Sequence, residues 1–470
     1  MPKEVSLEKI VSLAKRRGFI FPGSEIYGGL SGTWDYGPLG VLLKQKLIDW
    51  WRDYFVHQRS DMLMVDASIL MNSRVWRASG HTETFTDPLV ECQNCHNRFR
   101  ADKIDLSICP HCSKKNTFGE ARNFNLMFQT LIGPNSIQDQ TLEIDKSKLL
   151  DLINHQSSDL LKFNLNDFSS LVNPNLVYLR PETAQGIFTN FKNIIDSIYP
   201  DIPFGLAQYG KAFRNEISPR DFIFRSREFE QLEIEYFVRP QGWQKHFDQW
   251  VVFIQDWYQL IGLSQESIHL LEVPKGDLAH YSKRTIDFEY DFPIGKEELS
   301  GLAYRTDFDL KNIVNFSNKN IEYRDKKTNE SFIPHVIEPS FGVERMIMAI
   351  LTEAYTEEVM EDQSSRVVLK LAKRLAPIKV VVSPLLKNNQ PLVDKAFLLF
   401  KSLKKELKFV LYDDNGNIGK RYRRADEIGT PYCVTIDFQS LEDDTVTVRD
   451  RDTTSQERVS INQLIEYLNQ

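Results

Sequence analysis

The residues best suited to chemistry lie between Phe213 and Glu235, in the segment FRNEISPRDFIFRSREFEQLEIE. Apolar and charged residues alternate on both sides of Pro219, which predicts two antiparallel strands joined by a loop. We expect their polar faces to share one surface that carries Arg214, Glu216, Arg225, Arg227 and Glu228. Arginines on a rigid sheet suit a polyanion, and carboxylates beside them suit a cationic or hydrogen-bonding group. A nucleoside triphosphate together with a small amino acid fits this description. A solvated hairpin with surface ion pairs is the alternative.

Two further segments have similar potential. SFIPHVIEPSFGVERMIMAIL, residues 331 to 351, predicts a short strand that leads through Gly342 into a helix with Arg345 at its start. Glycine permits close approach of a ligand, and an arginine at a helix start suits a triphosphate. GGLSGTWDYGPLGVLLKQKLIDWWRDYFV, residues 28 to 56, predicts a glycine-rich loop and then a long amphipathic helix after Pro38.

In this order the three segments resemble motifs 1, 2 and 3 of the class II aminoacyl-tRNA synthetases. YLRPETAQGIF (178–188), FRNEISPR (213–220) and EPSFGVER (338–345) resemble, more narrowly, signatures of the glycyl-tRNA synthetase family of the single-chain, homodimeric type. The likeness runs nearly end to end. Residues 135 to 170 contain no motif and are interpreted as a variable insertion.

The resemblance implies an α+β fold in two domains. Residues 1–365 would form the class II catalytic domain, an antiparallel sheet flanked by helices, with an insertion at about 88–170 that contains a zinc knuckle. Residues 366–470 would form an α/β anticodon-binding domain, because strand and helix patterns alternate from residue 379 onward. Between the domains, residues 351 to 375 are expected to be helical.

The implied activity is ATP-dependent activation of glycine and its transfer to the 3′ end of tRNA(Gly). Arg214 would clamp the α-phosphate and the carboxylate, Glu216 would bind the adenine amino group, and Phe229 would stack on the ring. Arg345 would cover the other face of adenine or reach the γ-phosphate, which makes Arg214, Glu216 and Arg345 the expected catalytic residues. The full set of expected ATP contacts is Arg214, Asn215, Glu216, Phe224, Arg225, Ser226, Arg227, Glu228, Phe229, Glu298, Leu299, Gly342, Val343, Glu344 and Arg345.

Magnesium is expected to accompany ATP, since it neutralises charge and orients the pyrophosphate. Glu298 is the candidate ligand or ATP contact, although neighbouring Glu297 leaves the register open.

Glycine has no side chain, so its pocket must bind the ammonium group and exclude anything larger than hydrogen at Cα. By resemblance, Glu182, Glu338 and Ser340 form this pocket, with help from Glu233 and Arg305. The full set of expected contacts is Arg100, Glu182, Phe229, Glu230, Gln231, Leu232, Glu233, Arg305, Glu338, Pro339, Ser340, Phe341 and Gly342.

Four of the five cysteines form two CxxC pairs, Cys92/Cys95 and Cys109/Cys112, separated by thirteen residues. This spacing predicts a tetrahedral, structural Zn²⁺ site, because two thiolates two residues apart can reach one ion. Reduced thiols packed in a small lobe are the alternative. His96 and His111 are interpreted as bystanders, and Cys433 as a core residue of a strand.

The tail is more basic than the rest of an otherwise acidic chain of net charge −7. Lys420, Arg421, Arg423 and Arg424 surround Tyr422 and could grip phosphate and stack a base, or form a solvated loop instead. They are the expected tRNA contacts.

The apolar face of the helix after Pro38 contains Trp50, Trp51, Tyr54 and Phe55. It would form the interface of a homodimer by resemblance, or pack inside one subunit.

Composition narrows the class of protein. An apolar fraction of 41% indicates a folded chain, while no membrane span, signal peptide or GxxxxGK[ST] loop is visible, so we expect a cytoplasmic protein without membrane contact. Two alternatives remain: a synthetase for another amino acid, and a non-enzymatic, zinc-containing RNA-binding paralogue.

Overall fold

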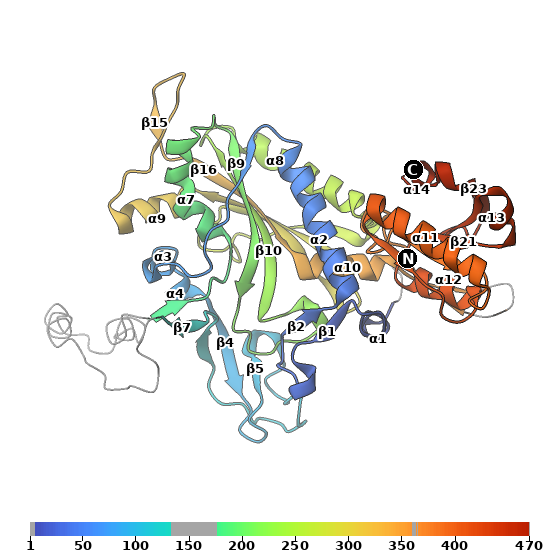
Figure 1. Cartoon of the computed structure of the whole chain (residues 1–470). Helices are drawn as coiled ribbons and strands as arrows, with labels where there is room; N and C mark the ends of the chain where they lie inside the picture. Colours follow the sequence, from blue (N-terminus) through green and yellow to red (C-terminus); the bar gives the residue numbers. More distant parts are fainter. Residues whose placement is uncertain (1–4, 133–175, 360–362, 364, 470) are drawn as a thin grey trace, which may run out of the picture.

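The computed structural model describes residues 5–132, 176–359, 363 and 365–469. A large body holds most of the chain, a small lobe extends from it, and the C-terminal domain stands beside it (Figure 1). The predicted insertion at residues 135 to 170 lies outside the described residues. No described helix is both long enough and apolar enough to cross a membrane.

A seven-stranded sheet forms the centre of the body. Its strands are antiparallel except for β3, which runs parallel to β9. The order across the sheet is β11 (Ile268–Glu272), β12 (Arg284–Phe292), β13 (Gly295–Thr306), β16 (His335–Gly342), β10 (Glu228–Val238), β9 (Phe204–Phe213) and β3 (Met62–Met64).

The two faces of this sheet differ because side chains alternate along each strand. On β10, Leu232 and Ile234 enter the main hydrophobic core, whereas Gln231 and Glu233 turn to the opposite face and line a cavity. β16 follows the same rule, since Glu233 pairs with Ser340 and both face the cavity. The alternation thus separates a packing face from a binding face.

Helices cover the packing face and close one end of the binding face. The first group consists of α2 (Pro38–Arg52), α8 (Trp243–Leu260) and α10 (Val343–Ala354), with α1 (Leu7–Arg17) beside them. The second consists of α7 (Ala184–Ser197) and α9 (Phe308–Ser317). The predicted helix after Pro38 is confirmed as α2, with Pro38 in its first turn, where a missing N–H costs no hydrogen bond.

The aromatic face of α2 packs inside the subunit. Trp51 and Phe55 are fully buried, and Trp50 and Tyr54 lie within 6 Å, ring to ring, of Trp257 on α8. Phe55 belongs to the π-helical turn Asp53–His57 that extends α2. These four rings therefore stabilise the monomer.

The cysteine-containing lobe is built on β4 (Thr86–Glu91), flanked by β5 (Arg98–Arg100) and β6 (Arg122–Asn125). Short helices α3 (Ser73–Ala78) and α4 (His81–Thr84) precede it. The remaining short strands pair locally as β1 (Ile20–Pro22) with β2 (Trp34–Tyr36), β7 (Gln129–Leu131) with β8 (Leu176–Tyr178), and β14 (Tyr323–Arg324) with β15 (Ser331–Phe332).

The C-terminal domain is a mixed five-stranded sheet with helices, as the alternating pattern predicts. Its strand order is β20 (Val410–Tyr412), β19 (Val380–Pro384), β21 (Tyr432–Ile436), β22 (Thr445–Asp450) and β23 (Gln456–Ser460). Its helices are α11 (Gln390–Leu407), α12 (Ile418–Glu427), α13 (Phe438–Asp443) and α14 (Leu464–Leu468). Cys433 is buried in β21, which confirms it as a core residue.

The prediction of a helix over residues 351 to 375 is wrong. Helix α10 ends at Ala354, and the chain continues as the hairpin β17 (Tyr355–Val359) and β18 (Ser365–Leu369). Alternation along β18 buries Arg366 and Val368, and this pattern of period two overrides the helix propensity of the neighbouring glutamates and lysines.

Candidate active site

A cavity of about 610 Å³ opens on the binding face of the sheet. Strands β10, β13 and β16 form its floor, the loop between β9 and β10 forms one wall, and the cysteine-containing lobe contributes Asp87 and Arg100 from another side. Segments from most of the body thus meet at one site.

Arginines gather at the end of the cavity nearest the β9–β10 loop. Arg214 lies just after β9, where its Nε donates to the carbonyl of Pro181 at 3.1 Å and its guanidinium lies 5.2 Å from the ring centre of Phe229. Arg225 lines the same wall, and Arg100 lines the cavity from the cysteine-containing lobe. The arrangement leaves guanidinium groups and an aromatic face toward the open space.

Arg345 approaches from the first turn of α10. It forms an ion pair with Glu298 at 3.0 Å and lies 4.6 Å from the ring centre of Phe224. The nearby Arg345 charge lowers the pKa of Glu298, against the effect of burial. Glu298 is a strand residue of β13 and lines the cavity together with Glu297.

Carboxylates occupy the other end of the cavity. Glu233 accepts hydrogen bonds from Ser340 Oγ at 2.9 Å, from Gln231 Nε2 at 2.9 Å and from the amide of Thr183 at 2.8 Å. Glu182 contacts His81 at 3.2 Å. All three glutamates of this end line the cavity: Glu233 and Glu338 lie on the neighbouring strands β10 and β16, and Glu182 lies just before α7.

Arg305 fixes this end from behind. Its Nη1 donates to both oxygens of Glu338 at 2.9 Å, and its Nε donates to Asp309 at 2.8 Å. The side chain is 2% exposed and does not line the cavity. Arg305 therefore orients Glu338, and the prediction that it contacts the substrate directly is not supported by its position.

The buried carboxyl groups have divergent pKa values. Burial, reinforced by Glu233 and Glu182, raises the pKa of Glu338 to about 8 in spite of Arg305. Burial alone would also raise that of Glu182, but the charges of His81 and Arg305 lower its pKa to about 2. The site thus combines an ionised carboxylate with a carboxyl that titrates in the physiological range.

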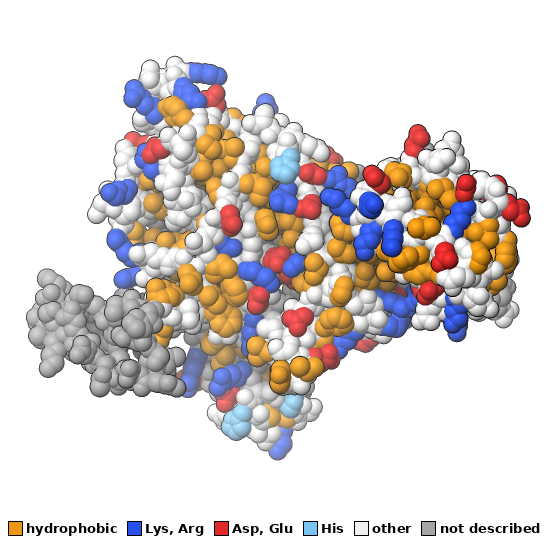
Figure 2. Space-filling view, in the orientation of Figure 1, with side chains coloured by type: hydrophobic (Ala, Val, Ile, Leu, Met, Phe, Trp, Pro, Cys, Tyr) orange, Lys and Arg blue, Asp and Glu red, His pale blue; other side chains and the backbone are white. Residues whose placement is uncertain are grey.

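The four cysteine sulfurs of the lobe cluster within 4.8 Å of one another, with Sγ distances of 3.7 Å for Cys92–Cys112 and Cys95–Cys109. Four sulfurs at about 2.3 Å from a tetrahedral zinc lie about 3.8 Å apart, so the geometry fits this ion. His96 is turned away to Glu91 at 3.2 Å. Histidines are also visible on the surface of the lobe in Figure 2.

Comparisons with known proteins agree with this geometry. Residues 171–354 match the profile of the tRNA synthetase class II core domain (G, H, P, S and T), and residues 379–470 match that of an anticodon binding domain. A glycine–tRNA ligase of Alkaliphilus oremlandii (strain OhILAs) is 44% identical over 100% of this chain and 99% of its own length. The glycine–tRNA ligase of Thermobifida fusca (strain YX) is 45% identical over 99% of this chain and 98% of its own length. That of Borrelia hermsii (strain HS1 / DAH) is 44% identical over 99% of this chain and 97% of its own length.

This chain belongs to the glycine–tRNA ligase family. The family resemblance inferred from the motifs is confirmed, as are the α+β fold class and the C-terminal anticodon-binding unit. The central sheet of this glycine–tRNA ligase family member brings together motif 2 at β9–β10 and motif 3 at β16–α10.

Most of the predicted ligand residues line the cavity. They come from the central sheet, the motif 2 loop, the cysteine-containing lobe, the segment before α7 and the start of α10: Arg100, Glu182, Arg214, Glu216, Phe224, Arg225, Ser226, Phe229, Gln231, Glu233, Glu298, Leu299, Glu338, Ser340, Gly342, Glu344 and Arg345.

The other predicted ligand residues do not line the cavity. Leu232, Phe341 and Val343 are fully buried in the hydrophobic core, and Pro339 alternates with the cavity residues Glu338 and Ser340. The remaining predicted contacts are absent from the cavity wall although they are polar: Asn215, Arg227, Glu228, Glu230 and Arg305.

Several of these polar residues have other partners, as already described for Arg305. Arg227 donates to the backbone carbonyl of Ser31 at 2.9 Å, and Glu228 pairs with Lys211 at 2.8 Å. Arg214, Glu216, Arg225 and Arg227 occupy the loop between the strands, because β9 ends at Phe213, and only Glu228 is a strand residue, the first of β10. The prediction that the polar faces of two strands carry all five charges is therefore wrong.

Several cavity residues lack a motif in the sequence. Tyr281 and Asp277 come from the segment between β11 and β12, and Phe85 and Asp87 come from the start of the lobe. Asp287 has a usable signal, since the alternation RTIDFEYDF predicts a polar face for it. Burial and the neighbouring Glu298 and Glu289 raise the pKa of Asp287 to about 7.

The predicted basic cluster of the tail is only partly at the surface. Lys420 and Arg423 are exposed on α12. Arg421 is 1% exposed and its guanidinium donates to the carbonyls of Pro384, Asp414 and Gly416, so its assignment as an RNA contact is wrong. Arg424 forms an ion pair with Asp413 at 2.7 Å.

Proposed function

We propose that this chain is a glycine–tRNA ligase that forms glycyl-adenylate from glycine and ATP and transfers glycine to the 3′ end of tRNA(Gly). The observation that carries this proposal is the polarity of one cavity, with guanidinium groups at one end and buried carboxylates at the other. Both reactants are anionic where they react, so positioning and charge neutralisation supply the catalysis.

Arg214 binds the α-phosphate and the attacking carboxylate of glycine. Phe229 stacks on adenine, whose amino group donates to Glu216; the Oε2 atom of Glu216 is buried without a hydrogen-bond partner among the described residues, which leaves it free to accept. Arg345 covers the nucleotide from α10, and Arg225 neutralises the outer phosphates. The catalytic residues of this proposal are Arg214, Glu216 and Arg345.

Magnesium accompanies the triphosphate as part of the substrate. Glu298 and Glu297 both line the cavity near Arg345, and carboxylate oxygens are ligands that Mg²⁺ accepts. Either residue can contribute, since both line the cavity.

Glycine binds at the carboxylate end. Glu182 and Glu338 receive its ammonium group, and Ser340 and Glu233 complete the wall. A pocket closed at Cα rejects larger amino acids by steric clash, and no smaller amino acid competes. A separate editing site is then unnecessary.

Zn²⁺ bound by Cys92, Cys95, Cys109 and Cys112 stabilises the lobe. Four thiolates complete the coordination of the ion, so its role is to hold the lobe folded. Arg100 belongs to the same lobe and lines the cavity, so metal binding affects the shape of the site.

The division into a catalytic domain and a C-terminal domain is part of the proposal, and the two profile matches, over residues 171–354 and 379–470, support it. The predicted boundary at residues 365 and 366 falls inside β18, so we place it after Leu369, at the end of the hairpin. Lys420 and Arg423 on α12 are retained as tRNA contacts. The protein acts as a homodimer in the cytoplasm, as expected for a translation enzyme of this type.

The test is pyrophosphate exchange into ATP with single amino acids. Glycine should stimulate exchange. Stimulation by serine, threonine or proline without glycine would favour a synthetase of another specificity, and no exchange with any amino acid would favour the RNA-binding paralogue.

A further inference from the structure

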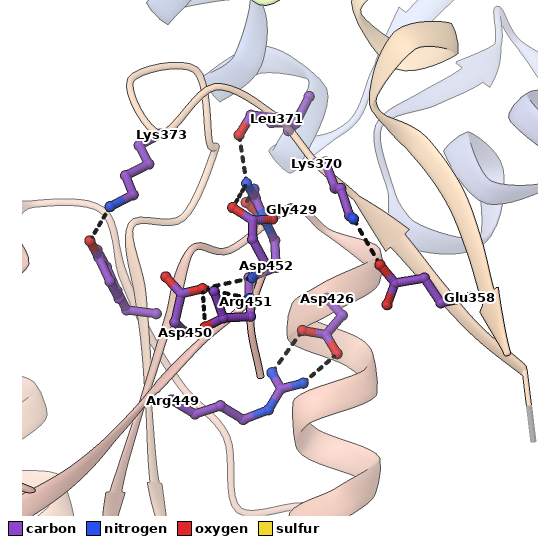
Figure 3. A network of polar contacts seen from close by, with 12 residues as sticks. Glu358, Lys370, Leu371, Lys373, Asp426, Gly429, Arg449, Asp450, Arg451 and Asp452 are labelled. Atoms are coloured by element: carbon purple, nitrogen blue, oxygen red, sulfur yellow. Dashed lines mark hydrogen bonds and ion pairs between the residues drawn. The ribbon is translucent and has the colours of Figure 1, made fainter. Parts of the chain in front are cut away.

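The junction between the C-terminal domain and the catalytic body is a buried polar cluster (Figure 3). At its centre Asp426, near the end of α12, is 1% exposed. Its Oδ2 accepts from Arg366 Nε on β18 at 2.8 Å, and its Oδ1 accepts from Arg449 Nη1 on β22 at 2.9 Å. One carboxylate therefore binds an arginine from each side of the junction.

The hairpin that carries Arg366 is part of the catalytic body. Its first strand, β17, follows directly from α10, and Glu357 of β17 pairs with Lys9 of α1 at 3.0 Å. Arg366 also pairs with Glu358 of β17 at 2.8 Å. The hairpin thus extends rigidly from the helix that begins with motif 3.

Two further contacts cross the same junction. Glu427, the neighbour of Asp426, pairs with Arg17 of α1 at 2.5 Å. Arg451, 3% exposed, donates to the carbonyl of Leu371 at 2.9 Å and to that of Gly429 at 2.8 Å. The end of α12 is therefore held at several points.

A joint of this kind fixes orientation more strictly than apolar packing does. Hydrogen bonds to a guanidinium are directional, and a buried arginine that loses its carboxylate retains an uncompensated charge. Rotation of the domain would separate Arg366 from Asp426, so Arg366 would lose one of its two carboxylate partners and Asp426 would keep only Arg449. The cluster therefore favours one angle between the domain and the body.

We propose that Asp426 is a positioning residue for the transfer step, because it holds the C-terminal domain at the angle at which tRNA bound there presents its 3′ end to the cavity. This inference rests on the proposed function. Helix α12 joins the two requirements, since it carries exposed Lys420 and Arg423 near its start and Asp426 near its end.

The first test is Asp426→Asn, which keeps the size of the side chain and removes its charge. Glycine-dependent pyrophosphate exchange should stay within about twofold of the wild type, because the cavity is unaltered. The kcat for charging tRNA should fall about tenfold or more, as expected when a reactant is slightly misplaced. Equilibrium binding of tRNA should change little, since its binding surface is intact.

The variant Arg366→Gln tests whether slow charging comes from a lost contact between the domains or from a folding defect of the C-terminal domain. It remains informative if Asp426→Asn does not fold. Arg366 lies on the body side of the junction, so its loss should reproduce the slow charging while the C-terminal domain keeps its own contacts. Asp444→Asn, which removes an ion pair with Lys395 inside the domain, is the control and should behave like the wild type.

Two results would overturn the proposal. If Asp426→Asn and Arg449→Gln slow charging but Arg366→Gln does not, Asp426 acts only within the C-terminal domain. If exchange and charging fall equally, or neither changes, the joint does not position tRNA. A wild type without glycine-dependent exchange would instead contradict the proposed function.

Discussion

Arg214 is held in place by its backbone as well as by its side chain. Its amide donates to the carbonyl of Arg227 at 2.9 Å, which closes the motif 2 loop at the strand end. We predict that Arg214→Ala lowers glycine-dependent exchange by at least about a hundredfold, the loss seen when one transition-state donor is removed. Pyrophosphate exchange measures it, and dimerisation and tRNA binding should persist.

The matched control is Arg220→Ala in the same loop. Arg220 is exposed, pairs with its neighbour Asp221 at 3.2 Å and does not line the cavity. Exchange by this variant should match that of the wild type. Survival of exchange in Arg214→Ala would refute the assigned role.

Glu338 should make glycine binding depend on pH. Its pKa, raised to about 8, lies far above the ordinary value, so the free site is largely protonated at pH 7. A cationic ammonium group favours the ionised carboxylate, and hence kcat/KM for glycine should rise about tenfold from pH 7 to pH 9. Exchange rates at subsaturating glycine measure this profile.

The variant Glu338→Gln identifies the titrating group. It should have low activity and lack the rise, because no carboxylate remains to ionise at that position. An unchanged rise in this variant would assign the titration elsewhere, for example to Glu344 or Asp287, whose pKa values are raised to about 7.

Individual cavity residues could be predicted from the sequence where the strand alternation and a family motif agreed. Glu233 and Ser340 could be predicted because their strands have a polar face. Leu232 and Phe341 were wrongly included because a motif names consecutive residues, whereas a strand turns every second side chain away. Tyr281 could not be predicted, since a loop without a pattern brings it to the cavity.

Among the elements, the cysteine-containing lobe gives the clearest prediction. The purified protein should contain about one zinc ion per chain. The variant Cys95→Ser should lose this zinc, and its lobe should unfold at a lower temperature than that of the wild type, because zinc binding contributes directly to folding. Metal analysis and thermal unfolding measure the two effects. Exchange should also fall, since Arg100 enters the cavity from this lobe.

Cys433→Ala is the control for thiol loss. Cys433 is buried in β21, remote in sequence from the four clustered sulfurs, so zinc content should be unchanged. A zinc-free wild type with a stable lobe would contradict the metal assignment and favour reduced thiols.

Helices and strands whose hydrophobic residues follow one clear periodicity could be predicted from the sequence, whereas segments with mixed signals could not. The tail pattern gave β19, α11, β20, α12, β21 and β22 in order, because each is either alternating or amphipathic. The hairpin β17–β18 was read as helix because its charged residues are good helix formers, while its pairing depends on contacts beyond the segment.

At the scale of the whole molecule, the activity depends on distant segments meeting on one sheet. Motif 2 and motif 3 lie almost a hundred residues apart in the chain, yet β10 and β16 are hydrogen-bonded neighbours. The resemblance supplied this topology, since local patterns do not specify which strands pair. The angle of the C-terminal domain, set at Asp426, lay beyond the sequence for the same reason.

The most direct test of this account is pyrophosphate exchange with each of the twenty amino acids in turn. The cavity predicts that glycine alone supports rapid exchange, and that alanine is rejected by clash at Cα. Exchange driven by a larger amino acid and not by glycine would contradict the account.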